Sequence, residues 1–178
     1  IDDVTVNEAA GTMTFTVTLS AASGLPVSVG YNTSNGTATA GSDYTAASGT
    51  INFAAGVISQ TITVAIGNDT VFESSETFNV NLTAPTNATI SDGLGIGTVR
   101  DDGNGAGGTD NDTPSLSVSS PTLGEGGFAV FTVSLSNPST TAVTFNPALA
   151  SGTATIGTNP APTTASACSL SWARAAKA

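Results

Sequence analysis

The residues of this sequence that could do chemistry are carboxylates. Seven of them lie in short polar segments, at Glu8, Asp43, Asp69, Glu73, Glu76, Asp101 and Asp102. The chain has no His and a single Cys, Cys168, so zinc sites, disulfide frameworks and His-based catalysis are excluded within it. If the carboxylates gather in space, their ligand type favours Ca²⁺, which prefers about six to eight oxygen ligands.

The charge balance points the same way. Thirteen acids face three bases, Arg100, Arg174 and Lys177, and the formal net charge is -10. A nucleic-acid partner is excluded, because phosphate binding needs clustered Lys and Arg. Carboxylates in such excess need either open water or bound cations around them.

An enzymatic role is the weakest interpretation, and we predict that the chain is not an enzyme. The sequence offers no nucleophile with a neighbouring base and no glycine-rich phosphate loop. Glu73 and Glu76 could be the carboxylate pair of a glycosidase. Residues three apart in a loop with other acids suit a metal better.

The elements that would position these acids are β-strands. Thr and Val favour strands, Gly, Asn, Asp and Ser favour turns, and no stretch has a sustained helical period. Alternation predicts an all-β, Ig-like antiparallel β-sandwich of about seven strands. The strands are expected near 3–7, 12–20, 26–33, 49–53, 57–66, 76–83 and 94–100. Phe15, Val17 and Leu19, like Phe78, Val80 and Leu82, should face the core.

Strand direction predicts where the acids meet. If successive strands run antiparallel, the turn after the first strand, the loops 34–48 and 67–75, and the residues after the last strand all lie at one end. All seven carboxylates then converge on one rim, whereas Asp92 lies at the opposite end. Mutual repulsion there either raises their pKa values or is relieved by a cation, so we predict Ca²⁺, with two or more ions plausible for this much charge.

Each of these acids also has an ordinary role open to it. Asp43 could cap its loop. Glu73 and Glu76 could be a solvated pair, and Asp101 and Asp102 could keep the following linker soluble.

The chain repeats itself. Val27-Ser-Val29 matches Val143-Thr-Phe145 and Gly36–Gly41 matches Gly152–Gly157 at one offset, and Glu125 lies in a turn like that of Glu8. We expect a first domain over 1–103, a Gly- and Asp-rich linker over 104–114, a partial second repeat over 115–159 and an irregular tail over 160–178. The incomplete copy could be a fragment of a longer array, an artefact of the reading frame, or an element completed by strands of another chain.

Four separated segments resemble the Calx-beta domain. They are Val4-Thr-Val-Asn-Glu8, Gly36-Thr-Ala-Thr-Ala-Gly-Ser-Asp43-Tyr44, Asn68-Asp69-Thr-Val-Phe-Glu73-Ser-Ser-Glu76-Thr-Phe78 and Val99-Arg-Asp101-Asp102. The resemblance covers residues 3–102 and implies a two-sheet sandwich in which the seven acids, with the backbone oxygen of Val71, bind calcium. Asn68 and Gly103 stand where the sodium–calcium exchanger members carry further acids, which implies fewer or weaker sites.

The function expected from these features is structural. The chain resembles calcium-binding repeats of secreted, extracellular cell-surface proteins, acting in adhesion and cell communication, with neighbouring repeats, copies of itself or cell-surface ligands as partners. No apolar run approaches the ~18 residues that span a membrane, so any membrane association would be indirect. The alternatives are a calcium-sensing regulatory domain of the exchanger type and a self-assembling fibre subunit that uses strand complementation. A carbohydrate-binding module is disfavoured, because aromatic residues make up only 6% of the chain and fall at core positions.

Overall fold

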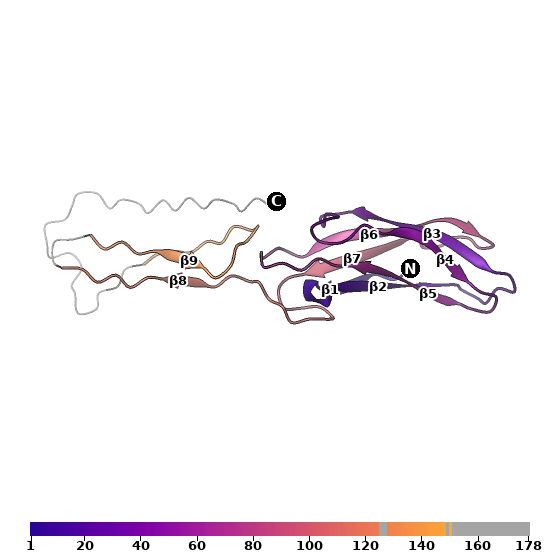
Figure 1. Ribbon diagram of the computed structural model, residues 1–178, viewed down its shortest axis with the longest axis horizontal. Helices are drawn as coiled ribbons and strands as arrows, with labels where there is room; N and C mark the ends of the chain where they lie inside the picture. Colours follow the sequence, from indigo (N-terminus) through magenta and orange to yellow (C-terminus); the bar gives the residue numbers. More distant parts are fainter. Residues whose placement is uncertain (125–127, 149, 151–178) are drawn as a thin grey trace.

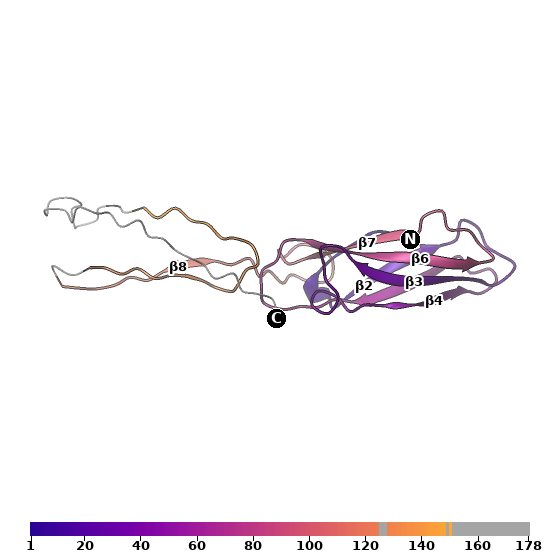
Figure 2. The same cartoon turned by 90° about the horizontal axis from the view of Figure 1, so that it is seen from above.

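The computed structural model describes residues 1–124, 128–148 and 150. Two bodies lie end to end along the long axis of the molecule, a seven-stranded first domain and a smaller second unit (Figures 1 and 2). In the described part of the chain the single helix is the 3₁₀ turn η1 (Glu8–Ala10). None of the described segments is therefore a helix that could cross a bilayer.

The strands of the first domain fall where alternation predicts them. They are β1 (Val4–Asn7), β2 (Thr12–Thr18), β3 (Val27–Asn35), β4 (Ser48–Phe53), β5 (Ser59–Ala65), β6 (Glu76–Thr86) and β7 (Leu94–Arg100). The all-β class is confirmed. The largest differences are at the ends of β2, β3, β5 and β6, where hydrogen bonding to a neighbouring strand decides the boundary.

The strands form two layers. One sheet has the order β1-β7-β6-β3-β4, and β2 and β5 pair as the second. Every pair is antiparallel except β1 with β7, which is parallel. This pair makes the larger sheet mixed rather than purely antiparallel. The parallel pairing agrees with the strand directions predicted from the sequence, in which the first and seventh strands both run toward the acidic end.

Alternating apolar side chains fill the space between the sheets. Phe15 and Phe78 are fully buried and meet edge to face, with ring centroids 6.0 Å apart. Tyr44 stacks on Phe78, with ring centroids 4.3 Å apart and an angle of 15° between the ring planes. Leu19 and Leu82 pack against this core and are partly buried. Ile58 does not join it: the residue precedes β5 and is 51% exposed.

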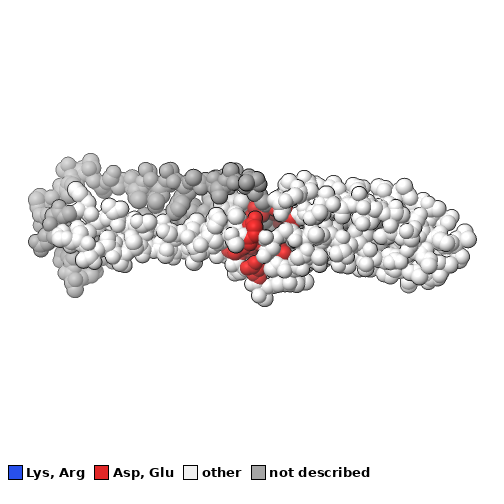
Figure 3. Space-filling model, viewed as in Figure 1, with Lys and Arg blue, Asp and Glu red and all other residues white. Residues whose placement is uncertain are grey.

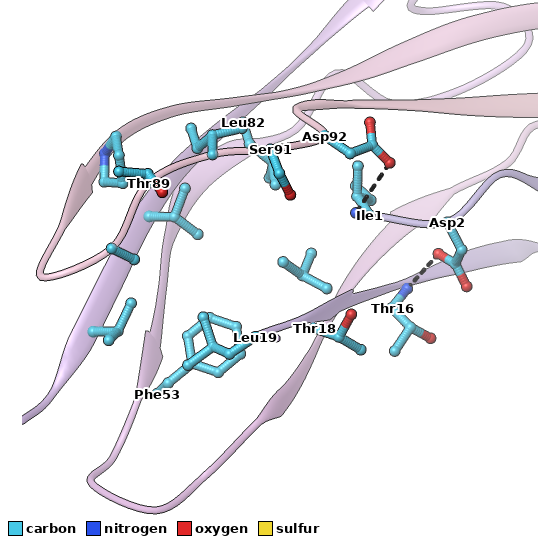
Figure 4. Close-up of a pocket in the computed structure, with 16 residues that line it drawn as sticks. Ile1, Asp2, Thr16, Thr18, Leu19, Phe53, Leu82, Thr89, Ser91 and Asp92 are labelled. Carbon is cyan, nitrogen blue, oxygen red and sulfur yellow. Dashed lines mark hydrogen bonds and ion pairs between the residues drawn. The ribbon is translucent and has the colours of Figure 1, made fainter. Parts of the chain in front are cut away.

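The end of the sandwich opposite the acidic loops opens into a cavity of about 540 Å³ between the sheets (Figure 4). Its walls are mainly apolar and include Leu19, Phe53 and Leu82. The amino group of Ile1 lies 3.6 Å from Asp92 at this end. Asp92 therefore lies apart from the other loop acids, as predicted.

The second unit is a small ribbon in which β8 (Leu116–Val118) pairs antiparallel with β9 (Val133–Leu135). Residues 143–145, the expected counterpart of 27–29, form no strand. A strand at 143–145 would have no partner to pair with, because the described residues contain no equivalent of β4 or β6 in the second unit. Several features of the predicted second repeat and tail lie outside the described residues, namely Glu125, Gly152–Gly157, and the tail 160–178 with Cys168.

One hydrogen-bonded pair recurs in both bodies. In the first domain the Asp2 amide donates to Thr16 O at 3.2 Å, and the Thr16 amide donates to Asp2 Oδ1 at 2.6 Å. In the second unit the Ser119 amide donates to Thr132 O at 2.9 Å, and the Thr132 amide donates to Ser119 Oγ at 2.8 Å. The two pairs occupy different positions, since Asp2 precedes β1 whereas Ser119 follows β8.

The linker folds back over the first domain. The Asn7 amide donates to Ala106 O at 3.0 Å, and Asn7 Nδ2 donates to Asp110 O at 2.9 Å. Gly105 has φ +108°, and a Cβ at this position would lie 2.7 Å from the Asn7 nitrogen. A glycine is required there, and the linker returns to the end of the sandwich where the acids lie.

Candidate metal centre

The acidic end of the first domain meets the second unit at the waist of the molecule. Acidic side chains gather there, and Figure 3 shows them as a band between the two bodies. Two groups of three carboxylates are close enough to share an ion. Asp92 and Asp2 are instead at the opposite end (Figure 4).

Site A consists of Glu8, Asp101 and Asp112, whose nearest carboxylate oxygens lie within 4.8 Å of one another. Glu8 opens η1, which is fixed because Asn7 Oδ1 accepts from the Ala9 amide at 3.0 Å. Asp101 follows β7 in phase with Val99, so its side chain faces inward. Glu8 and Asp101 are only 6% and 3% exposed.

Site B consists of Asp43, Glu73 and Glu76, again with one oxygen of each within 4.8 Å of the others. Asp43 is buried in the loop between β3 and β4, and its Oδ2 accepts from the Thr39 amide at 2.7 Å. The stacking of Tyr44 on Phe78 anchors this loop to the core. Glu76 is the first residue of β6. The sandwich therefore holds both the loop that carries Asp43 and the segment that carries Glu76.

The two sites touch. The Glu73 amide donates to Asp101 Oδ2 at 2.8 Å, which joins the β5–β6 loop to the end of β7. A small cavity of about 10 Å³ is lined by residues of both sites, among them Glu8, Asp43 and Asp101. Its size is about that of one water molecule. All three acids of Site B, and Glu8 and Asp101 of Site A, therefore line one small cavity.

The electrostatics of Site A disfavour three bare charges. Burial, followed by the charge of Asp101, raises the pKa of Glu8 to about 8. Burial also raises the pKa of Asp101, although amide donors from Glu73 and Asp112 oppose the rise. The pKa of Asp112 is raised by burial and then by the charges of Asp110 and Asp69. A cation among these carboxylates would reverse the cost of ionising them.

Two acids expected at the rim lie at the margins of these sites. Asp69 is exposed, and its amide makes a 3.4 Å bond to Glu8 Oε1 while its carboxylate accepts from the Val71 amide at 2.7 Å. Asp102 alternates with Asp101 and turns outward. It lies 3.9 Å from Arg100 and accepts from the Asn104 amide at 3.1 Å. Although desolvation opposes ionisation, the bonds from Asn104 and the charge of Arg100 lower the pKa of Asp102.

Asp112 is the site residue that sequence reasoning missed. It lies in the segment interpreted as a linker, and its approach depends on the return of that segment across Asn7. The signal available in the sequence was the run Asp110-Asn-Asp112, which places several oxygen donors just before Pro114. Strand directions could not place this run, because it lies well beyond the end of β7 in a linker whose path no strand fixes.

The donor set fits calcium. All side-chain donors of Sites A and B are carboxylate oxygens on loops and element ends, as calcium prefers. With Ca–O distances of about 2.3–2.6 Å, opposite ligands stand about 5 Å apart, so one ion can bridge oxygens at the observed spacing. Among the described side chains, Arg100 Nε and Asp112 Oδ2 are the buried polar atoms that lack a hydrogen-bond partner. Asp112 Oδ2 is thus an available donor.

Solved structures with the same architecture come from CALX proteins. The calcium binding domain CBD12 of CALX1.1 has a TM-score of 0.52 at 30% identity, covering 55% of this chain and 42% of that one. CBD12 of CALX1.2 has a TM-score of 0.54 at 28% identity, covering 57% and 46%. The chain thus matches less than half the length of either. The apo form of the Calx CBD1 domain has a TM-score of 0.52 at 30% identity, covering 57% and 90%.

The comparison with protein families agrees with the structures. No curated protein matches the chain. The Calx-beta domain model matches residues 2–98, which include every strand of the first domain except the last two residues of β7. Since this match takes in more than half of the sequence, the chain belongs to the Calx-beta domain family.

Proposed function

We propose that the first domain binds calcium at Sites A and B and that the bound ions stiffen its junction with the second unit. The observation that carries this proposal is the convergence of five carboxylates of the first domain, from segments far apart in sequence, into two groups with ligand spacing: Glu8 and Asp101 at Site A, and Asp43, Glu73 and Glu76 at Site B. The similarity to a calcium binding domain of CALX1.1 supports the choice of ion.

The residues of this chain would act as ligands and as supports for ligands. The carboxylates of each site supply negative oxygens, and the ion supplies the charge that offsets their repulsion. Backbone donors from Thr39 and Glu73 orient Asp43 and Asp101. The carboxylates come together only when the chain is folded, so calcium binding would stabilise the folded state over the unfolded state.

The junction explains how an ion at the rim would affect the second unit. The Phe72 amide donates to Pro138 O at 2.9 Å, and the Thr140 amide donates to Phe72 O at 3.0 Å. Asn137 Nδ2 donates to the backbone oxygen of Asp112. Phe72 precedes Glu73 of Site B, and Asp112 belongs to Site A. Fixing the two sites would therefore fix the segments that the second unit contacts.

A structural, adhesive role at the cell surface follows as part of the proposal. A rigid junction repeated along a secreted multi-domain protein would make a stalk, with neighbouring repeats as its partners. The composition is compatible with this location, since the chain has one Cys and one Lys. Extracellular calcium modules work with dissociation constants of about 10⁻⁴–10⁻³ M. No part of this role is catalytic.

The test is calorimetric titration of the full chain, freed of metal, with calcium. Saturable binding is expected at up to millimolar calcium. The variants Glu8→Gln and Glu76→Gln should each weaken binding by removing a ligand charge from one site. Asp92→Asn, the matched control at the opposite end, should leave binding unchanged. The proposal fails if the unaltered chain takes up no calcium or if Asp92→Asn weakens binding as much as Glu8→Gln.

Calcium sensing is the second candidate, and the CALX likeness favours it. A sensor changes shape between its two states, whereas a stalk only becomes more rigid. Small-angle scattering with calcium and with chelator separates them. A change in the radius of gyration beyond that expected from reduced flexibility would favour the sensor.

Self-assembly is the third candidate, and exposed apolar side chains of the second unit favour it. Phe128 is 88% exposed, Val130 75% and Phe131 52%, and exposed apolar patches often mark interaction sites. The occupant would be a second copy that adds strands to the open ribbon. Sedimentation over a hundredfold range of concentration tests this candidate, and a monomer throughout would remove it.

A further inference from the structure

The linker brings Asp112 into Site A and holds it there. Its amide donates to Asp101 Oδ1 at 3.3 Å, and its backbone oxygen accepts from Asn137 Nδ2. One residue before it, Asn111 forms an isolated antiparallel bridge with Asp102. The main chain on both sides of the carboxylate is thus pinned to the first domain and to the second unit.

The carboxylate itself has an unused donor atom. Asp112 Oδ2 is buried and has no hydrogen-bond partner, and an oxygen of the same carboxylate lies within 4.8 Å of oxygens of Glu8 and Asp101. Arg100 is the one Lys or Arg in the described part of the chain, and it pairs with the outward-facing Asp102. A buried, unpartnered carboxylate oxygen facing two further carboxylates costs free energy unless a proton or a cation neutralises the charge.

We propose that Asp112 is a calcium ligand supplied by the linker, so that the ion in Site A clamps residues 104–112 onto the first domain. This inference rests on the proposed calcium binding but is separate from it, since Site A could bind through Glu8 and Asp101 alone. Asp112 thus adds a third carboxylate to Site A from a segment outside the sandwich. The ion would then hold the linker in place as well as the acidic end of the first domain.

Asp110 offers a closely matched control for Asp112. It lies two residues from Asp112 and carries the same charge, but its Oδ1 accepts from the Asn111 amide at 3.1 Å and it is not part of Site A. Its backbone oxygen accepts from Asn7 Nδ2 at 2.9 Å, a bond that survives a side-chain change. Asp110→Asn therefore removes one charge from the same segment and leaves the ligand set intact.

The experiment compares the full chain with Asp112→Asn and Asp110→Asn. Calorimetric titration with calcium should show about a tenfold or larger loss of affinity at one site in Asp112→Asn, because ligand charge sets calcium affinity. Asp110→Asn should change affinity by less than about threefold, the size of a general charge effect. The second readout is amide hydrogen exchange of residues 104–112 with calcium and with chelator.

The outcomes separate the two ideas. Calcium should slow exchange in the linker of the unaltered chain and of Asp110→Asn, but not of Asp112→Asn. If the unaltered chain binds calcium while Asp112→Asn binds equally well and the linker exchanges at the same rate, the linker ligand is wrong and calcium binding stands. If the unaltered chain binds no calcium, both ideas fail. If Asp112→Asn does not fold, the unaltered chain still provides a test, because calcium binding without any slowing of exchange in residues 104–112 would overturn the linker ligand.

Discussion

The amide of Glu73 donates a 2.8 Å hydrogen bond to the carboxylate of Asp101. Glu73 belongs to Site B and Asp101 to Site A, so this bond connects the two candidate ion sites through one short loop. A shift of the Asp101 carboxylate on binding an ion would therefore be passed to the backbone of Glu73. The two sites are therefore expected to act as one unit rather than as separate pockets.

The first prediction contrasts two adjacent acids. Asp101→Asn should weaken calcium binding at both sites, because Asp101 supplies a ligand oxygen to Site A and holds the Glu73 amide beside Site B. Asp102→Asn should have a much smaller effect, because that carboxylate faces Arg100 and Asn104. Calorimetry on both variants measures the difference. Equal losses would show that both acids face the ions.

The second prediction concerns pH in the absence of calcium. The pKa of Glu8 is raised from 4.5 to about 8 in the folded chain, so the folded state binds more protons than the unfolded state between these values. The resulting stabilisation is complete below about pH 4.5 and is lost as the pH rises through about 8. Asp101 and Asp112 act in the same direction.

Urea unfolding in chelator from pH 5 to 8.5 measures this effect. The free energy of unfolding should fall with rising pH, and Glu8→Gln should flatten the fall because its amide does not titrate. Calcium competes with the proton, so its stabilising effect should be larger at pH 8 than at pH 6. A free energy of unfolding that rises with pH in chelator would contradict the raised pKa of Glu8.

The third prediction concerns thermal stability. Calcium at a hundred times the dissociation constant should stabilise the folded chain by about 2.7 kcal/mol, which for a domain of this size raises Tm by about 10 °C or more. Scanning calorimetry in calcium, in magnesium and in chelator provides the comparison. Magnesium should give a smaller shift, because it demands a tighter octahedral geometry. Identical transitions in calcium and chelator would argue against binding to the folded state.

The fourth prediction tests how the core supports Site B. Phe78→Ala removes a fully buried ring that contacts both Phe15 and Tyr44. The variant should lose about 3–5 kcal/mol of stability. Calcium affinity of the folded variant should also fall, because Tyr44 is the neighbour of Asp43 and loses its stacking surface. Denaturation and calorimetry on one sample report both effects, and an unchanged affinity would separate the core from the site.

The sequence was sufficient to predict the sandwich because the pattern is regular where burial is complete. Phe15 and Val17 alternate with Thr in β2, and the structure buries both apolar side chains. The predicted gathering of acids relied on strand direction alone, and Glu8, Asp43 and Asp101 do lie at the same end. Whether these residues bind ions stays a prediction.

Other features of the structure could not be predicted from alternation and strand direction. Asp101 and Asp102 are adjacent in sequence, and only the phase of β7 separates their directions. The approach of Asp112 depends on long-range bonds, such as that of Asn7 Nδ2 to Asp110 O, which no local pattern records. The second unit had too few strands for alternation to be informative, so residues 143–145 resembled a strand that the structure does not form.

The most direct measurement of the central claim is a crystal structure of the full chain grown in calcium, with anomalous differences used to locate the ions. The account predicts anomalous peaks among Glu8, Asp101 and Asp112 and among Asp43, Glu73 and Glu76. Peaks should be absent beside Asp92 at the opposite end. Millimolar calcium that leaves both carboxylate groups without a peak would contradict the account.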